Sequence, residues 1–237
     1  MDNDASSYNS PDFVFAKGVP DNPGETMPAR VGAPAPSFEA LSLDGGTVRL
    51  SDLKGRYVVV MTGAVTSPMC SHEVPALNKL QDDFGGQGVS FFLLYTRESH
   101  PAENYPAHAS MEQKIAHARD LHRLEGVRVP VLVDSLDGAI HRSYGAWPAA
   151  LFVIDRNGRL VYRANMANTL ELRQLLEDLI EGDRQAAQGE VLHGQYSERL
   201  VPHLADKDTH HRVYERAGPK AFEDHWVRSP HQRGLWP

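Results

Sequence analysis

Apolar residues along this chain fall into runs and stripes that predict buried strands alternating with amphipathic helices. Residues 57–61 are continuously apolar and residues 89–95 nearly so, which is typical of strands covered on both faces. Between them, from about Cys70 to Gly85, large apolar side chains recur at helical spacing. These side chains are Val74, Leu77, Leu80 and Phe84. Strand, helix and strand together predict one parallel βαβ unit.

Shorter patterns on either side add further strands and helices. Asp44-Gly45-Gly46 and Asn157-Gly158 each separate two apolar runs, and they predict hairpins over residues 38–50 and 150–162. Helices are expected over residues 110–124, 138–144 and 169–182, and a strand over residues 129–133. This order of elements predicts an α/β protein with a thioredoxin-like arrangement, a mixed central sheet with helices on both faces.

The two ends of the chain differ in composition from its middle. Residues 1–30 are rich in Asp, Asn, Ser, Pro and Gly without any period, so we expect them to be mobile or draped over the surface. Residues 31–182 carry the strand and helix patterns and are expected to form one domain. Residues 183–237 contain proline breaks and several large apolar side chains. We expect them to form an arm with short helices that docks on the core, or on a second copy in a homodimer.

Composition and charge exclude several classes of function. A net charge of −7 argues against a nucleic-acid surface. No apolar run approaches the roughly 20 residues that cross a bilayer, and residues 1–30 lack the pattern of a signal peptide. The single cysteine suits a reducing compartment, so a cytoplasmic location is expected. The histidines near the C-terminus lack a ligand spacing, so we expect no metal and no cofactor.

The candidate chemistry lies at residues 63–73, where the first buried strand passes into a helix. Ligand and catalytic sites in open α/β sheets lie at the carboxyl ends of strands. A cysteine in the first helical turn feels the positive end of the helix dipole, which favours the nucleophilic thiolate. We therefore expect Cys70 to face solvent, to have a lowered pKa and to alkylate fast. Ser67 or Thr66 would cap the helix and donate a hydroxyl proton toward the sulfur.

Motifs in this segment resemble those of the redoxin group. Ser67-Pro68-Met69-Cys70 resembles the thioredoxin motif Cys-x-x-Cys with serine in place of the first cysteine. The segment is also similar to the peroxiredoxin motif Pro-x-x-x-Thr/Ser-x-x-Cys, with Gly63 at the proline position and Glu73 as the acidic residue one turn on. The resemblance implies a peroxide-reactive Cys70 and antioxidant activity, although Ala149 falls near the position of the peroxide-steering arginine. Without a second cysteine, turnover needs an external thiol reductant.

A stronger resemblance is to the iodothyronine deiodinases. Their motif Gly-Ser-x-Thr-Sec-Pro-Pro-Phe is similar to residues 63–70, so that Ser67 stands at the selenocysteine position. Their motifs Tyr-x-x-Glu-Ala-His and Tyr-Gly-Ala-x-Pro-Glu-Arg-Leu-Tyr are similar to residues 95–100 and 144–152. The resemblance implies a small-molecule substrate held near His100, Trp147, Pro148 and Gly63. Pro148 also resembles the cis-proline of thioredoxin folds.

Each of these residues has a structural interpretation as well. Cys70 could be a small buried hydrophobe, and Glu73 a helix carboxylate stabilised by the dipole rather than a general base. His100 could be an ordinary loop histidine, and Trp147 a core residue. Three functions therefore stay open. They are a redoxin-type oxidoreductase, a deiodinase-like dehalogenase or small-molecule tailoring enzyme, and a non-catalytic binding module.

Overall fold

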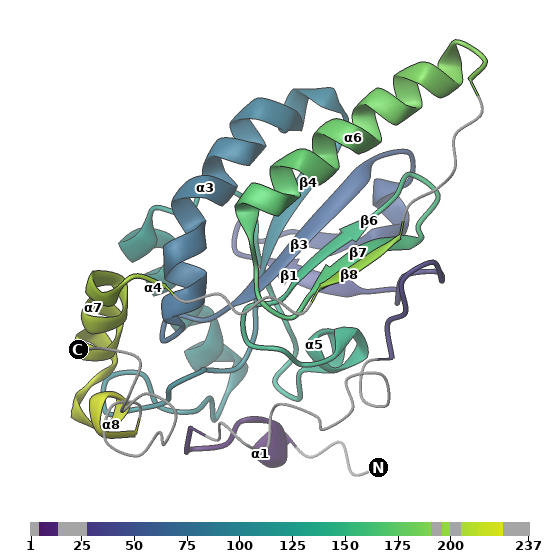
Figure 1. Cartoon of the computed structure of the whole chain (residues 1–237). Helices are drawn as coiled ribbons and strands as arrows, with labels where there is room; N and C mark the ends of the chain where they lie inside the picture. The colour runs from purple at the N-terminus through teal and green to yellow at the C-terminus, as the bar shows by residue number, and fades with distance from the viewer. Residues whose placement is uncertain (1–4, 14–27, 191–195, 200–204, 225–237) are drawn as a thin grey trace.

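A mixed β-sheet forms the centre of the computed structural model (Figure 1). The structure describes residues 5–13, 28–190, 196–199 and 205–224. Within these residues the sheet has eight strands in the order β2-β1-β5-β4-β3-β6-β7-β8. The strands are β1 (Glu39–Ser42), β2 (Thr47–Arg49), β3 (Tyr57–Gly63), β4 (Val89–Tyr95), β5 (Val131–Val133), β6 (Leu151–Ile154), β7 (Leu160–Ala164) and β8 (Ser197–Arg199). The α-helices are α1 (Ala5–Tyr8), α3 (Pro68–Phe84), α4 (Met111–Glu125), α5 (Ala139–Tyr144), α6 (Thr169–Ala187), α7 (Lys207–Ala217) and α8 (Pro219–Phe222).

The predicted βαβ unit is confirmed by β3, α3 and β4. β3 is buried along its whole length and pairs in parallel with β4, from Tyr57 opposite Val89 to Gly63 opposite Tyr95. β5 pairs in parallel with β4 on its other side, and both predicted hairpins, β1 with β2 and β6 with β7, are antiparallel. The carboxyl ends of β3, β4 and β5 therefore meet at one edge of the sheet.

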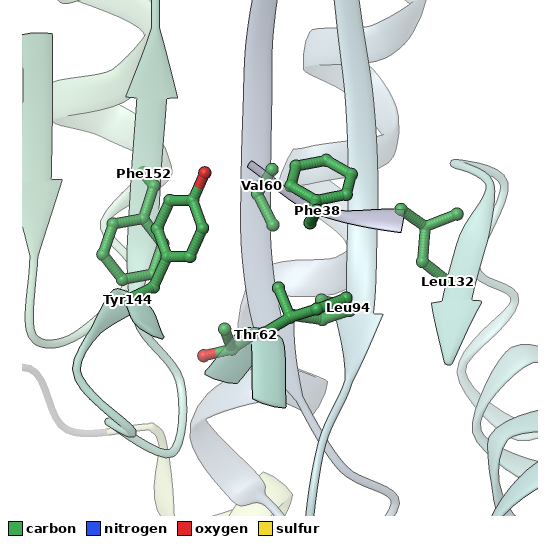
Figure 2. A pocket seen from close by; sticks show the side chains of 8 residues that line it. Phe38, Val60, Thr62, Leu94, Leu132, Tyr144 and Phe152 are labelled. Atoms are coloured by element: carbon green, nitrogen blue, oxygen red, sulfur yellow. The ribbon is translucent and has the colours of Figure 1, made fainter. Parts of the chain in front are cut away.

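Helices cover both faces of the sheet. Residues of α3, α4 and α6 share one core with one face of the strands, while α5 packs against the other face. The α5 face encloses a small cavity with an almost wholly apolar lining (Figure 2). Its lining residues are Phe38, Val60, Thr62, Leu94, Leu132, Ile140, Tyr144 and Phe152. Such a lining gives bound water or a polar substrate too few partners, so we assign this cavity to core packing.

Segments near both ends of the chain dock on the sheet and its helices. Tyr8 of α1 is buried, and its hydroxyl lies 2.7 Å from Nδ1 of His141 in α5. Residues 1–4 and 14–27 of the segment expected to be mobile or draped lie outside the described residues. In the arm, α7 docks on the core, where His72 of α3 pairs with Asp206 at 2.9 Å. None of the helices in the described ranges is long and apolar enough to cross a membrane.

Three elements depart from the prediction, and the first is α1, a helix in a segment for which none was expected. α6 continues to Ala187, beyond the expected end at residue 182. β8 was not expected, and it pairs in parallel with β7 at the edge of the sheet. Its three residues are polar or charged and mostly exposed, so no alternation of apolar and polar positions marks them as a strand.

Candidate active site at the carboxyl ends of β3 and β4

The loop between β3 and α3 brings the predicted site residues to the carboxyl edge of the sheet. Gly63 ends β3, and the Ser67 side chain accepts a hydrogen bond from the backbone N–H of Cys70 at 3.3 Å. Pro68 is the first residue of α3, a position where the missing N–H leaves no helical bond unmade. The predicted cap by Ser67 is confirmed, and Cys70 lies in the first turn of the helix.

Cys70 points into the core. Its side chain is fully buried, and a Cβ atom added at Gly63 would lie 2.3 Å from its Sγ. Burial raises the pKa of the thiol to about 12, and the charge of Glu125 adds to this rise, against an opposing hydrogen bond from Ala64. The prediction of a solvent-facing thiol with a lowered pKa is therefore wrong. Cys70, the third residue of α3, faces the sheet. The loss of hydration of its thiolate raises the pKa by more than the helix dipole lowers it.

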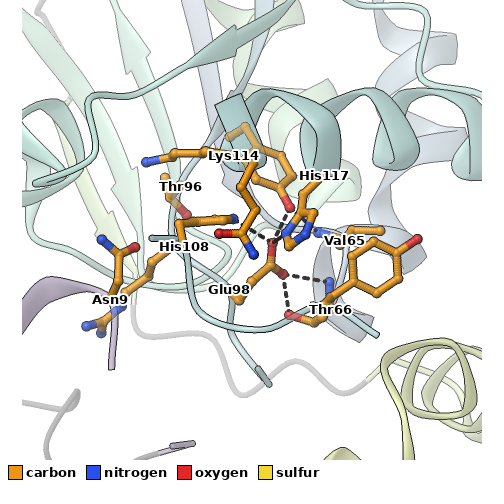
Figure 3. A network of polar contacts seen from close by, with 12 residues as sticks. Asn9, Val65, Thr66, Thr96, Glu98, His108, Lys114 and His117 are labelled. Carbon is orange, nitrogen blue, oxygen red and sulfur yellow. Dashed lines mark hydrogen bonds and ion pairs between the residues drawn. The ribbon is translucent and has the colours of Figure 1, made fainter. Parts of the chain in front are cut away.

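A buried carboxylate, Glu98 in the loop after β4, gathers the polar groups at this edge (Figure 3). Thr66 donates to Oε2 of Glu98 from its backbone N–H at 3.3 Å and from its hydroxyl at 2.6 Å. The Tyr95 hydroxyl donates to Oε1, which also lies 3.0 Å from Nε2 of His108 and 3.1 Å from Nδ1 of His117. This network ties the β3–α3 loop to β4 and α4.

Hydrogen bonds keep the Glu98 carboxylate ionised. Burial by itself would raise its pKa, but hydrogen bonds from both histidines and from Thr66 outweigh burial and lower the pKa to about 2. Burial lowers the pKa of His108, with a partial opposing effect of Glu98, so this imidazole is neutral at pH 7. Burial and the charge of Glu98 raise the pKa of Tyr95, so its phenol keeps its proton and donates it.

Thr66 connects two loops and does not contact the sulfur through a donated proton. Its Oγ1 accepts the backbone N–H groups of Ser99 and His100, each at 3.1 Å, and gives its proton to Glu98. The predicted donation from Thr66 to a Cys70 thiolate is therefore wrong, because the hydroxyl has one proton to give. Thr66 instead holds the loop that carries His100 beside the start of α3.

His100 is enclosed by segments from distant parts of the chain. Its ring lies 4.2 Å from the ring of Phe13 and 4.9 Å from the ring of Tyr214 in α7, measured between centroids. The Tyr214 hydroxyl lies 3.5 Å from Nε2 of His100, and the histidine is 7% exposed. A ligand could contact this ring only after one of the two aromatic neighbours moved. Substrate binding by His100 stays a prediction.

Glu73 and Trp147 make contacts that serve the fold. Glu73 is buried, and its carboxylate accepts the backbone N–H of Thr169, the first residue of α6, at 3.0 Å. Trp147 is buried in the core on the α5 face, and its carbonyl accepts the Thr62 hydroxyl at 3.0 Å. The contacts of these two residues match their structural interpretations.

The bend before Pro148 is made without a cis bond. The peptide bond between Trp147 and Pro148 is trans, so the prediction of a cis-proline is wrong. Ala146 has a φ of +57°, and this left-handed residue turns the chain between α5 and β6. Because Ala146 makes the turn, the chain enters β6 with the ordinary trans bond before Pro148.

Three side chains of the network have the donor types of a metal site. The ligand atoms of Glu98, His108 and His117 all lie within 4.8 Å of one another, and all three residues are buried. The motif at residues 95–100 contains Glu98, but sequence reasoning missed both histidines. They lie in a loop and in the middle of α4, at a spacing that matches no common ligand motif. Only the tertiary structure brings them together.

Comparisons with known proteins agree with this architecture. The family profile described as Redoxin matches residues 30–179. Thyroxine 5-deiodinase from Gallus gallus is 30% identical over 138 residues, which are 53% of this chain and 53% of that protein. The thiol-disulfide oxidoreductase ResA from Bacillus thuringiensis subsp. konkukian is 25% identical over 142 residues, 60% of this chain and 73% of that protein. The chain thus spans about half the length of the deiodinase that it matches.

A solved structure supports the fold assignment. The thioredoxin domain of a thiol-disulfide oxidoreductase from Bacteroides vulgatus superposes with a TM-score of 0.51 at 19% identity, covering 64% of this chain and 98% of that domain. At this identity the likeness concerns the fold alone. The predicted thioredoxin-like fold is confirmed.

Proposed function

Because this chain belongs to the Redoxin family, we propose that it is a thiol-dependent oxidoreductase that acts on a small molecule through Cys70. The observation that carries the proposal is the place of this cysteine, the only one in the chain, in the helical turn directly after the central strand. Similarity to thiol-disulfide oxidoreductases such as ResA supports it. The Cys70 thiolate would attack a peroxide oxygen, breaking the O–O bond to give a sulfenic acid and water or an alcohol. With a disulfide it would break the S–S bond to give a mixed disulfide and release a thiol. An external thiol, of the kind kept reduced in the cytoplasm, would then restore the oxidised cysteine.

The buried state of Cys70 requires an opening step before reaction. With its pKa raised to about 12 by burial, the Cys70 thiol is almost wholly protonated at pH 7. Polar contacts hold the start of α7 over this turn. Asp206 at the start of α7 pairs with His72, and the backbone N–H of Ala205 lies 3.3 Å from the Met69 sulfur. Covered contacts, the Glu125–Arg216 pair and the buried Val213 and Tyr214, also hold α7. Exposure of this turn therefore requires a local opening of α7, at a free-energy cost below that of global unfolding.

Thiol labelling of the full-length protein tests this proposal. Cys70 should react slowly with a maleimide and with hydrogen peroxide. Asp206→Ala should accelerate both reactions about tenfold, because it removes the N-cap of α7, which accepts the Thr209 N–H at 2.9 Å, together with the pair to His72. Asp208→Ala, a neighbouring change outside the His72 contact, is the matched control. Consumption of peroxide or of a small disulfide in the presence of dithiothreitol should disappear in Cys70→Ser. Turnover that is equal in wild type and Cys70→Ser would overturn the assignment of Cys70.

A second candidate, a redox-inactive binding module for an aromatic small molecule, is favoured by one observation. Ser67, at the position that resembles the selenocysteine of deiodinases, has a hydroxyl that caps α3, and the nearby sulfur is buried. Under this hypothesis Cys70→Ala would bind a halophenol as tightly as wild type and neither protein would release halide. Release of iodide from a halophenol in the presence of a dithiol would support the deiodinase-like alternative instead.

A further inference from the structure

Beyond thiol chemistry, we infer that Glu98, His108 and His117 form a binding site for a divalent transition-metal ion, with zinc as the best fit. The three residues supply one carboxylate oxygen and two imidazole nitrogens from the loop after β4 and from α4. This His₂Glu donor set is one that proteins use for zinc, with a fourth position left for water or another ligand. Figure 3 shows the three side chains converging on one point beside the β3–α3 loop.

The spacing of the donors is close to that of a zinc site. Both histidine nitrogens approach the same oxygen, Oε1 of Glu98, at 3.0 Å and 3.1 Å. Ligand atoms about 2.0–2.1 Å from a tetrahedral zinc ion lie roughly 3.3 Å from one another. The two imidazole rings, with centroids 5.1 Å apart and planes inclined by 55°, can therefore share an ion. Because both nitrogens lie closer than this to Oε1, the Glu98 carboxylate has to move outward to admit the ion.

Thr66 already orients the Glu98 carboxylate, as residues that hydrogen-bond a metal ligand do in known metal sites. Thr66 holds Oε2 of Glu98 through two hydrogen bonds, at 2.6 Å and 3.3 Å, so this oxygen stays fixed while Oε1 turns to the ion. Such outer hydrogen bonds orient ligands and raise metal affinity. The side chains of Glu98 and His108 are fully covered, whereas that of His117 is 10% exposed. The side of His117 therefore offers the ion its route in.

Metal binding requires a rearrangement of protons that the site can accommodate. A neutral histidine binds the ion through a bare nitrogen, so its proton moves to the other ring nitrogen. Within the described residues, Nδ1 of His108 has no hydrogen-bond partner, and placing the proton there breaks no existing bond. The ion replaces the two histidine–carboxylate contacts. Thr66 keeps its bonds to Oε2, and the Tyr95 hydroxyl can donate to the second lone pair of Oε1. The buried Lys114, whose Nζ donates to Ser135 at 2.8 Å, opposes the added positive charge and moderates the affinity.

Titration of the metal-stripped, full-length protein tests the inference. Zinc followed by calorimetry should bind with one ion per chain and a Kd below about 10 µM. Cobalt should give the visible absorption of a tetrahedral site. His108→Ala and His117→Gln should each weaken zinc binding by about tenfold or more. His122→Ala on the exposed side of α4 and Cys70→Ser should leave it unchanged, which separates this site from the thiol.

The glutamine at position 117 guards against a variant that merely misfolds, because its amide can still donate a hydrogen bond to Glu98 while it is a poor zinc ligand. Zinc should also raise the melting temperature of the wild type but not of His117→Gln, since only a native-state site stabilises the fold. No stoichiometric binding by the wild type, or binding by both histidine variants as tight as that of the wild type, would overturn the inference. Either result would leave the proposed role of Cys70 intact.

Discussion

Gly63 shows how one residue fixes the contact between β3 and α3. A Cβ atom at this position would lie 2.3 Å from Sγ and 3.0 Å from Cβ of Cys70. Gly63→Ala should therefore lower the free energy of unfolding by about 2–3 kcal/mol through overpacking. Urea denaturation would measure it. Cys70→Ala in the same chain should recover part of the loss, because it removes the clashing sulfur, and strictly additive effects of the two changes would contradict this explanation.

His141 is expected to make stability depend on pH. Burial lowers the pKa of its imidazole to about 3, below the ordinary value of 6.5. Between these pH values the unfolded chain takes up a proton that the folded chain does not, so stability is full above pH 6.5 and falls as the pH drops toward 3. The loss amounts to about 3 kcal/mol at pH 4.5. Urea unfolding at a series of pH values would measure this slope.

A control for this prediction is His141→Gln, which cannot titrate. It should be less stable than wild type at pH 7, because Nδ1 of His141 lies 2.7 Å from the Tyr8 hydroxyl and Nε2 lies 2.7 Å from the Trp147 carbonyl. Its stability should fall less between pH 6.5 and 4.5 than that of wild type. Parallel pH profiles for the two proteins would assign the acid sensitivity to other groups.

At the residue scale, sequence reasoning succeeded where an effect is local. Ser67 caps α3 because the preference for serine before a helix depends only on nearby backbone. The burial of Cys70 could not be read in this way, since it depends on which face of the first turn meets the sheet. The same limit hid His108 and His117, which reach Glu98 only after β4 and α4 have packed.

At the scale of elements, Glu73 joins α3 to α6. Its carboxylate accepts the N–H of Thr169, while Asn168 caps the next two N–H groups of α6. Glu73→Ala would leave the Thr169 N–H unpaired in a buried position and should cost about 1–3 kcal/mol. Glu73→Gln keeps an acceptor and should cost less. Thermal melts of both variants would measure these losses of stability. An activity assay would test the alternative role, because a general base at position 73 would tolerate neither change.

The strands and long helices could be predicted because their signals are periodic and lie within a few residues. β3 and β4 follow from continuous apolar runs, and the β6–β7 hairpin follows from Asn157-Gly158. β8 carries no such signal, because a short polar edge strand is stabilised by its neighbour's backbone and not by its own side chains. Its position next to β7 had to come from the structure.

At the scale of the whole molecule, a buried acid fastens the arm to the domain. Glu125 at the end of α4 accepts a hydrogen bond from the Arg212 guanidinium at 2.7 Å and also pairs with Arg216. Arg216 in turn donates to the Val65 carbonyl at 3.3 Å. Glu125→Ala would leave Arg216 largely buried and unpaired, which is costly. Hydrogen exchange of α7 should then become at least about tenfold faster.

The matched control for the arm is Glu215→Ala, which removes an exposed carboxylate from α7 itself. Its effect on hydrogen exchange should be small, because exposed pairs contribute little. If Glu125→Ala left the exchange of α7 unchanged, the arm would be held mainly by its apolar contacts, such as those of Val213 and Tyr214 in the buried face of the helix.

Residues from opposite ends of the sequence meet over His100, where Phe13 and Tyr214 cover its ring and Asp12 pairs with Lys220 at 3.2 Å. This juxtaposition sets an order of assembly during translation. Strands β1 to β7 can pair while the ribosome is still adding the arm, but this edge cannot close until residue 220 has emerged. A nascent chain halted before that point would lack the Tyr214 side of the cover over His100.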